Sequence, residues 1–176
     1  MIVIMTAILG VFYTFLISGI AYTIFPNKAA GSLIIKGNKI IGSELIGQQF
    51  TSDKYFHGRP SAVDYNTMPS GASNLSAISQ KLKESSIANK NAFISKNSLN
   101  SSAAVPAEMI FSSASGIDPH ISLDAAKLQV NRIASARNMD KNKINEIINK
   151  VKEDRQFGIL GEERVNVLLL NIELDK

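Results

Sequence analysis

The sequence predicts an α+β protein in which a single N-terminal transmembrane helix precedes one compact domain with a β-hairpin, central helices and a C-terminal strand. Residues 2–25 carry no charge, two amphipathic helical patterns lie between residues 122 and 151, and short strand-like segments lie near both ends of the remaining chain. A chain of 176 residues has room for one domain beside a membrane segment. We therefore expect an anchor at residues 1–26 and a folded domain at residues 27–176.

The uncharged N-terminal segment has the length of a membrane span. Its 24 residues form a helix of about 36 Å, whereas the hydrocarbon core of a bilayer is about 30 Å thick. A secretory signal peptide has a basic start and a shorter apolar core, and this segment has neither. Tyr13, Tyr22 and Pro26 are typical of a helix that ends at a membrane interface. A single-pass anchor is the preferred interpretation, and a buried core helix is the alternative.

The charges beside this segment bear on its orientation. Lys28, Lys36 and Lys39 follow it, and only the terminal amine precedes it. By the positive-inside rule, these lysines favour a cytoplasmic domain.

The first strand-like segment predicts a β-hairpin. Residues 31–42 contain two short β-branched runs separated by Gly37 and Asn38, which both tolerate a positive φ. Residues 44–66 are rich in Phe, Tyr, Gly and Pro and predict ordered irregular structure.

Polar segments in the middle of the chain predict less regular helices. Ser73 or Asn74 can cap a helix. Its apolar face consists of Leu75, Ile78 and Leu82. Residues 85–104 are mostly Ser, Asn and Lys, which is compatible with disorder. Three apolar residues in this stretch favour a partly packed helix: Ile87, Phe93 and Ile94.

Two later helices have clear caps and apolar stripes, and a strand is expected to follow them. Ser122 caps the first helix and Asp140 the second. The stripes are Ala126, Val130, Ile133 and Ala134, then Ile144, Ile147, Ile148 and Val151. Residues 165–174 predict the C-terminal strand, because apolar and polar residues alternate at its end.

The sequence offers little for catalysis. It has no cysteine and no phosphate-binding, dinucleotide-binding or nucleophile-elbow motif. Ser113, Ser115, Asp118 and His120 stand close together in the sequence, but residues of these types in a Gly/Pro-rich segment usually bond the local backbone. We therefore predict a turn at this place rather than a hydrolase site.

Other polar residues are candidates for binding. His57, His120 and Asp118 could share a metal ion, although structural histidines are the more common outcome. Arg59 could serve as a buried ion-pair partner or an interface anchor. Gln129 and Arg132 lie one turn apart, where they could contact a phosphate, but a solvated or interface face is the favoured interpretation. The net charge of +4 is spread without basic runs or alternating aromatic residues, so nucleic-acid binding is not expected.

Several segments resemble the KdpC family, the C subunits of Kdp potassium-transporting ATPases. They cover most of the chain in the family's order and include residues 42–50 (GSELIGQQF), 55–62 (YFHGRPSA), 113–122 (SASGIDPHIS), 129–134 (QVNRIA) and 161–171 (GEERVNVLLLN). The resemblance implies a non-catalytic subunit of an ATP-driven potassium uptake pump. Its expected partners are a P-type subunit that hydrolyses ATP, a channel-like subunit that carries the ion, and the lipid bilayer.

The resemblance also implies functional details. The family's C subunit is needed for assembly and stability, and has been described as a catalytic chaperone that raises the ATP affinity of the pump. If nucleotide contact occurs, the family's proposed glutamine best matches Gln129. ATP is expected only in a ternary complex with the catalytic subunit, because no recognisable nucleotide-binding motif is present. The family architecture implies that the domain lies outside the cell membrane, which is opposite to the orientation that the lysines favour. A membrane-anchored hydrolase and an extracellular binding module are the alternatives from other classes.

Overall fold

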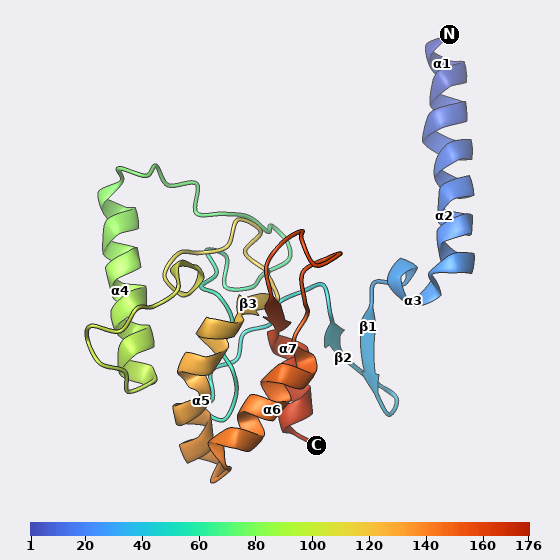
Figure 1. Cartoon of the computed structure of the whole chain (residues 1–176). Helices are drawn as coiled ribbons and strands as arrows, with labels where there is room; N and C mark the ends of the chain where they lie inside the picture. Colours follow the sequence, from blue (N-terminus) through green and yellow to red (C-terminus); the bar gives the residue numbers. More distant parts are fainter. The chain divides into compact units, whose positions relative to one another are not determined.

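The computed structural model describes residues 1–176, and their contacts divide them into two units, Met1–Leu45 and Ile46–Lys176 (Figure 1). The first unit contains α1 (Ile2–Met5), η1 (Thr6–Phe12), α2 (Tyr13–Ile24), α3 (Pro26–Ala29), β1 (Leu33–Lys36) and β2 (Lys39–Ser43). The second contains α4 (Gln80–Lys96), η2 (Ala107–Met109), β3 (His120–Ser122), α5 (Leu123–Arg137), α6 (Lys141–Val151), β4 (Arg164–Asn166) and α7 (Val167–Leu174). The predicted α+β class is confirmed.

The apolar N-terminal segment is one continuous helix of 23 residues, Ile2–Ile24. Its middle part, η1, has π-helical hydrogen bonding, which the sequence pattern did not predict. None of the helix is buried within the structure, and by length and composition it is able to cross a membrane. The helix ends where Phe25 leaves the helical conformation, and Pro26 starts the short α3 with a φ that suits a first helical position.

The predicted hairpin is confirmed. β1 and β2 pair antiparallel, with Lys36 opposite Lys39 across the Gly37-Asn38 loop. Gly37 has a φ of +63°, a conformation that costs glycine little because it has no Cβ. At the base of the hairpin, the Ser43 hydroxyl donates to the Gly31 carbonyl at 2.7 Å. By its contacts, this hairpin belongs with the apolar helix in the first unit.

The core of the second unit lies around a two-stranded sheet and three helices. β3 and β4 pair antiparallel, with Ile121 opposite Val165. α5 packs against α6 and both strands, and α6 packs against α7 (Figure 1). The largest fully buried apolar side chains in this core are Phe56, Ile121, Ile133, Ile144, Ile148, Val165 and Leu170. Burial of such side chains is the main favourable contribution to folding.

Both predicted helix caps are confirmed. The Ser122 hydroxyl accepts the Ala125 N–H, and the Asp140 carboxylate accepts the Asn142 N–H. The first predicted stripe is buried along α5, and Ile144 and Ile148 are buried along α6. These caps satisfy N–H groups that have no partner inside the helix.

The helix predicted to begin at residues 73–74 begins later, at Gln80. Asn74 has a φ of +52°, which a right-handed helix cannot contain, and Ile78 is 95% exposed rather than packed. The polar stretch after residue 85 does form a helix up to Lys96, with Phe93 buried against the core.

The predicted C-terminal strand over residues 165–174 is wrong. Only Arg164–Asn166 is a strand, and α7 follows at once. The Asn166 side chain accepts the N–H groups of Leu168 and Leu169, which makes it an N-cap. The buried positions Val167, Leu170, Asn171 and Leu174 follow a helical spacing.

Candidate functional site

Gln129, the residue proposed for ATP contact, lies inside the second unit with 0% exposure. Its Oε1 accepts the His57 N–H and an Arg132 guanidinium N–H, each at 2.8 Å. Its Nε2 donates to the carbonyls of His57 and Ala125, at 3.1 and 3.3 Å. Two of these bonds join α5 to the backbone of His57, and the other two stay within α5, to Ala125 and Arg132. Together they use all hydrogen-bonding capacity of the amide, and nucleotide contact stays a prediction.

Arg132 is buried beside Gln129 and links three parts of the second unit. Its Nη1 donates to the carbonyls of Asp53 and Tyr55, and its Nε donates to Asn97 Oδ1 at 2.9 Å. Burial lowers the pKa of this guanidinium, and the charge of Asp53 opposes that shift. The expected solvated or interface face at Gln129 and Arg132 is wrong, because both side chains are buried within the second unit and are hydrogen-bonded there.

The two histidines have different surroundings. His57 Nε2 lies 3.0 Å from the Ser52 carbonyl, and burial together with the charge of Arg132 lowers its pKa to about 4. His120 lies with Nδ1 3.6 Å from Asp118 and Nε2 3.6 Å from Glu153. The structure contains no group of three His, Cys, Asp or Glu side chains able to hold a metal ion.

Asp118 organises the segment that the sequence singled out. Its carboxylate accepts from Arg59 at 2.6 Å and from the His120 N–H at 3.0 Å. Burial acts to raise its pKa, but hydrogen bonds from His120 and Arg59 outweigh burial and lower the pKa to about 2. Asp118 is therefore an ionised structural anchor, and Arg59 is its half-buried ion-pair partner, which is one of the two roles considered for Arg59 from the sequence.

The serines near Asp118 form a turn, as predicted. Ser113 Oγ accepts the N–H of Gly116 at 2.9 Å, and Ser115 Oγ accepts the N–H of Ile117 at 3.3 Å. Gly116 has a φ of +73° in this turn. Neither hydroxyl is paired with an imidazole, so the arrangement lacks the activated nucleophile that a hydrolase needs.

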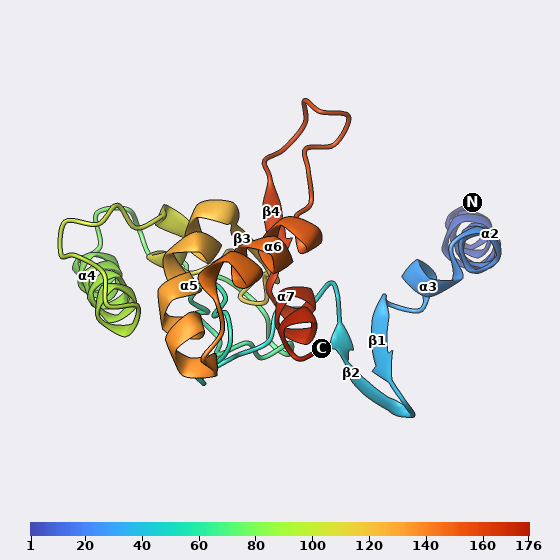
Figure 2. The same cartoon turned by 60° about the horizontal axis from the view of Figure 1, so that its bottom comes forward.

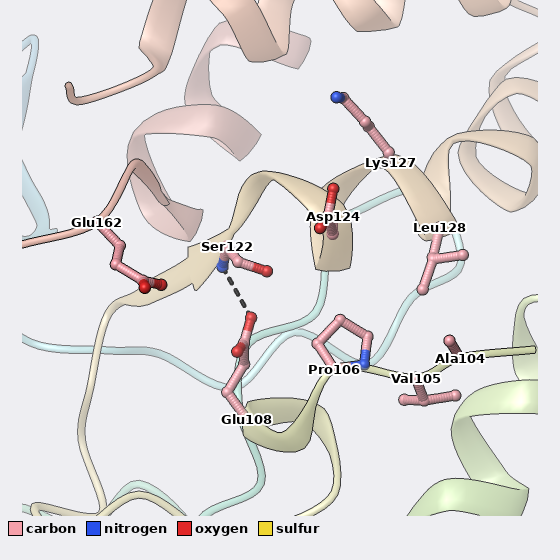
Figure 3. Close-up of a pocket in the computed structure, with 9 residues that line it drawn as sticks. All are labelled: Ala104, Val105, Pro106, Glu108, Ser122, Asp124, Lys127, Leu128 and Glu162. Carbon is pink, nitrogen blue, oxygen red and sulfur yellow. Dashed lines mark hydrogen bonds between the residues drawn. The ribbon is translucent and has the colours of Figure 1, made fainter. Parts of the chain in front are cut away.

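A surface groove of about 630 Å³ lies beside η2 and the start of α5 (Figure 3). The carboxylates of Glu108 and Glu162 lie near Ser122, at one end of the view, and Glu108 accepts the Ser122 N–H at 2.9 Å. Val105 and Leu128 lie at the other end of the view. With Asp124 there are three carboxylates in the lining against one cation, Lys127. Such a groove can receive a basic side chain but carries no nucleophile–base pair.

Sequence reasoning did not single out this groove. Glu108 and Glu162 are more than 50 positions apart, and only the fold brings them to one surface. The position of Glu108 shortly after Pro106 is typical of the start of a short helical turn. Nothing in the sequence pattern relates Glu108 to Glu162.

Comparison with known proteins places the chain among transport subunits. The family model described as "K+-transporting ATPase, c chain" matches residues 1–176. A potassium-transporting ATPase KdpC subunit from Polynucleobacter asymbioticus is 45% identical, with 98% of this chain and 93% of the relative covered. KdpC subunits from Bradyrhizobium diazoefficiens and Caldanaerobacter subterraneus are 43% and 44% identical, covering 100% and 95% of this chain and 93% and 86% of those relatives.

Proposed function

Because the chain belongs to the family of KdpC subunits of the K+-transporting ATPase, we propose that it assembles and stabilises an ATP-driven potassium uptake pump from one side of the membrane. A subunit of this family is an accessory part of the complex and not its catalytic subunit. The family match over residues 1–176 is the observation that carries the proposal. The proposed partners are the ATP-hydrolysing P-type subunit and the channel-like subunit.

The apolar helix and the second unit differ in ways that support separate roles for them. The apolar helix Ile2–Ile24 exposes its side chains throughout, as a segment that contacts lipid or other membrane helices does. The second unit has a packed core and no paired nucleophile and base. We propose that the helix anchors the chain in the cell membrane beside the channel-like subunit, while the folded unit contacts the partners outside the bilayer.

For the orientation, we propose that the second unit is extracytoplasmic. Lys28, Lys36 and Lys39 are spread over a dozen residues, and whole domains can cross a membrane despite such a weak charge signal. Protease added to right-side-out spheroplasts should then digest the second unit, and protease added to inside-out vesicles should spare it. The reverse pattern would contradict this orientation.

For ATP, we propose an indirect effect. The Gln129 amide already makes four hydrogen bonds inside the second unit, so the ATP affinity of the pump is altered through contacts with the catalytic subunit. The isolated chain should then show no saturable binding of an ATP analogue. Binding by the isolated chain that is lost in Gln129→Ala, with the fold intact, would contradict the indirect route.

The main test is co-purification from detergent with a tag on the ATP-hydrolysing subunit. The full chain should be recovered with both larger subunits, and a chain without residues 1–26 should be recovered poorly. A chain whose apolar helix is replaced by an unrelated membrane helix of equal length separates simple membrane retention from specific helix packing. If the full chain never co-purifies, or turns over a substrate alone, the proposed function is wrong.

A further inference from the structure

Residues 153–164 form a finger that leaves α6 and returns to β4. Figure 2 shows this loop extending beyond the helices of the second unit. At its tip, Phe157 is 92% exposed, Ile159 is 78% exposed and Leu160 is 58% exposed. Single exposed apolar residues are ordinary, but three large ones gathered at the tip of a projecting loop typically mark an interaction site.

The finger is held in one conformation by its own hydrogen bonds. Gln156 and Leu160 exchange both backbone N–H···O bonds at 2.9 Å. Gly158 and Gly161 have φ values of +73° and +78°, which let the chain turn tightly around the apolar residues. The tip is therefore presented in a defined shape, which reduces the entropy lost when it binds a partner.

Ion pairs fix the base of the finger. Glu153 and Arg164 are paired through both backbone N–H groups, and Arg164 Nε contacts the Glu153 carboxylate at 2.9 Å. Lys152 contacts the carboxylates of Asp154 and Glu163, at 2.6 and 3.2 Å. Two backbone hydrogen bonds thus join the base of the finger to the start of β4, with exposed ion pairs beside them.

The charges around the finger favour a protein partner with basic groups. Residues 152–164 contain four carboxylates and three basic side chains. Glu162, at the base of the finger, also lines the groove that holds the carboxylates of Glu108 and Asp124. Three of the four finger carboxylates are already paired with Lys152 or Arg164. The charge left for a partner is therefore that of Glu162 beside Glu108 and Asp124, and a protein surface with a basic rim would complement it.

We propose that the apolar tip of this finger inserts into an apolar pocket, rimmed by basic side chains, on another subunit of the same transport complex. The groove beside the finger receives one of the basic side chains. This inference rests on the proposed function and adds to it the contact surface outside the membrane.

The test uses the full chain co-expressed with its partner subunits and a tag on the ATP-hydrolysing subunit. In one variant Phe157→Ser, Ile159→Ser and Leu160→Ser are combined. In the matched control, Met68→Ser and Ile78→Ser alter two side chains that are 83% and 95% exposed in another loop. We expect the finger variant to be recovered about tenfold less under a stringent salt and detergent wash, with no loss for the control. Equal recovery of both variants, or equal loss of both, would overturn the proposal.

A fluorescent probe at the tip gives a second readout that does not depend on comparing two variants. The chain contains no cysteine, so Phe157→Cys can be labelled on the purified chain with an environment-sensitive fluorophore before the larger subunits are added. Its emission should be that of a solvated fluorophore in the purified chain in neutral detergent, and should shift to shorter wavelength in the complex. An unshifted spectrum in the complex overturns the proposal. A shift caused by phosphatidylglycerol vesicles alone, or by self-association of the purified chain, overturns it in favour of a lipid surface or a second copy.

The outcomes remain distinct from those of the proposed function. If that function fails, the unmodified chain does not co-purify at all. If only the finger proposal fails, the unmodified chain co-purifies and the finger variant is recovered in the same amount as the unmodified chain.

Discussion

In most proteins polar side chains lie at the surface and large apolar side chains lie in the core. The junction around Gln129 buries polar side chains, whereas the finger exposes large apolar ones. At the junction, an amide and a guanidinium lie inside the second unit; the Gln129 amide uses its full hydrogen-bonding capacity and the Arg132 guanidinium donates four hydrogen bonds. At the finger, Phe157 and two aliphatic side chains project into solvent. The polar groups of the first arrangement find their partners within the chain, whereas the second leaves apolar surface that the chain itself does not cover. Substitutions should therefore affect stability at the junction and assembly at the finger.

The largest loss of stability is expected for Arg132→Met. Methionine keeps part of the volume but leaves the Asp53 and Tyr55 carbonyls and Asn97 Oδ1 without their donor. Buried groups that lose a charged hydrogen-bond partner cost several kcal/mol in total, and we expect about 3 kcal/mol. Urea denaturation measures the change, with exposed Lys143→Ala as the control that should lie near zero. A loss below about 1 kcal/mol would mean that Arg132 does not join these segments.

Gln129→Ala should follow, with a loss of about 2 kcal/mol, because the His57 N–H and carbonyl lose their partner. Gln80→Ala, at an exposed helix start, provides the matched control. An unchanged melting temperature for Gln129→Ala, together with a changed KM for ATP in the assembled pump, would instead favour the nucleotide role.

Gly47→Ala tests close packing near Asp118. A Cβ at this position would lie 2.6 Å from the Asp118 carbonyl oxygen, which is backbone and cannot move aside easily. We expect a loss of about 1–3 kcal/mol from this overpacking. At Gly71 a Cβ would meet no atom within 4 Å, so Gly71→Ala should be nearly neutral in the same thermal melts. Similar effects of both changes would show that the contact does not govern stability.

His57 should make the second unit less stable in acid. Its pKa is lowered from 6.5 to about 4, so between these values the unfolded state binds more protons than the folded state. Stability is then complete above pH 6.5 and falls as the pH drops toward 4, by about 1 kcal/mol at pH 5 after allowance for partial solvent exposure. Asp118 continues the same trend, between 3.8 and about 2. The free energy of unfolding of His57→Asn should differ less between pH 7 and pH 5 than that of the unmodified chain. An equal difference would show that His57 is not the cause of the pH dependence.

The smallest effect on stability is expected at the finger. Phe157→Ser removes almost no buried area, so the free energy of unfolding should change by less than about 0.5 kcal/mol. A large decrease in the free energy of unfolding, measured by urea denaturation, would show that the tip packs against its own unit. The finger would then affect stability, as Gln129 does.

Much of the fold could be predicted where one local pattern dominated. The caps at Ser122 and Asp140 and the Gly37-Asn38 loop depend on nearby residues, and all three were correct. α7 was mistaken for a strand because its run of apolar residues satisfies both a strand and a helix period. The cap at Asn166 decides between them, and it lay one residue inside the expected strand.

The candidate site was less accessible to sequence reasoning. An ion pair was one of the two roles considered for Arg59, whereas the burial of Gln129 depends on the backbone of His57, which is 72 positions away. Likewise, the groove depends on the distant carboxylates of Glu108 and Glu162. Exposure of the apolar tip could not be inferred from Phe157, Ile159 and Leu160 themselves, because the same residues could equally have entered the core.

The central claim is that this chain assists a transporter and carries out no chemistry itself. The most direct test is potassium-stimulated ATP hydrolysis by three purified samples: the complete complex, the larger subunits purified without this chain, and this chain alone. We predict stimulated hydrolysis by the complete complex, a strong reduction without the chain, and none by the chain alone. Hydrolysis by the isolated chain, or full activity of a stable complex that lacks it, would contradict the account.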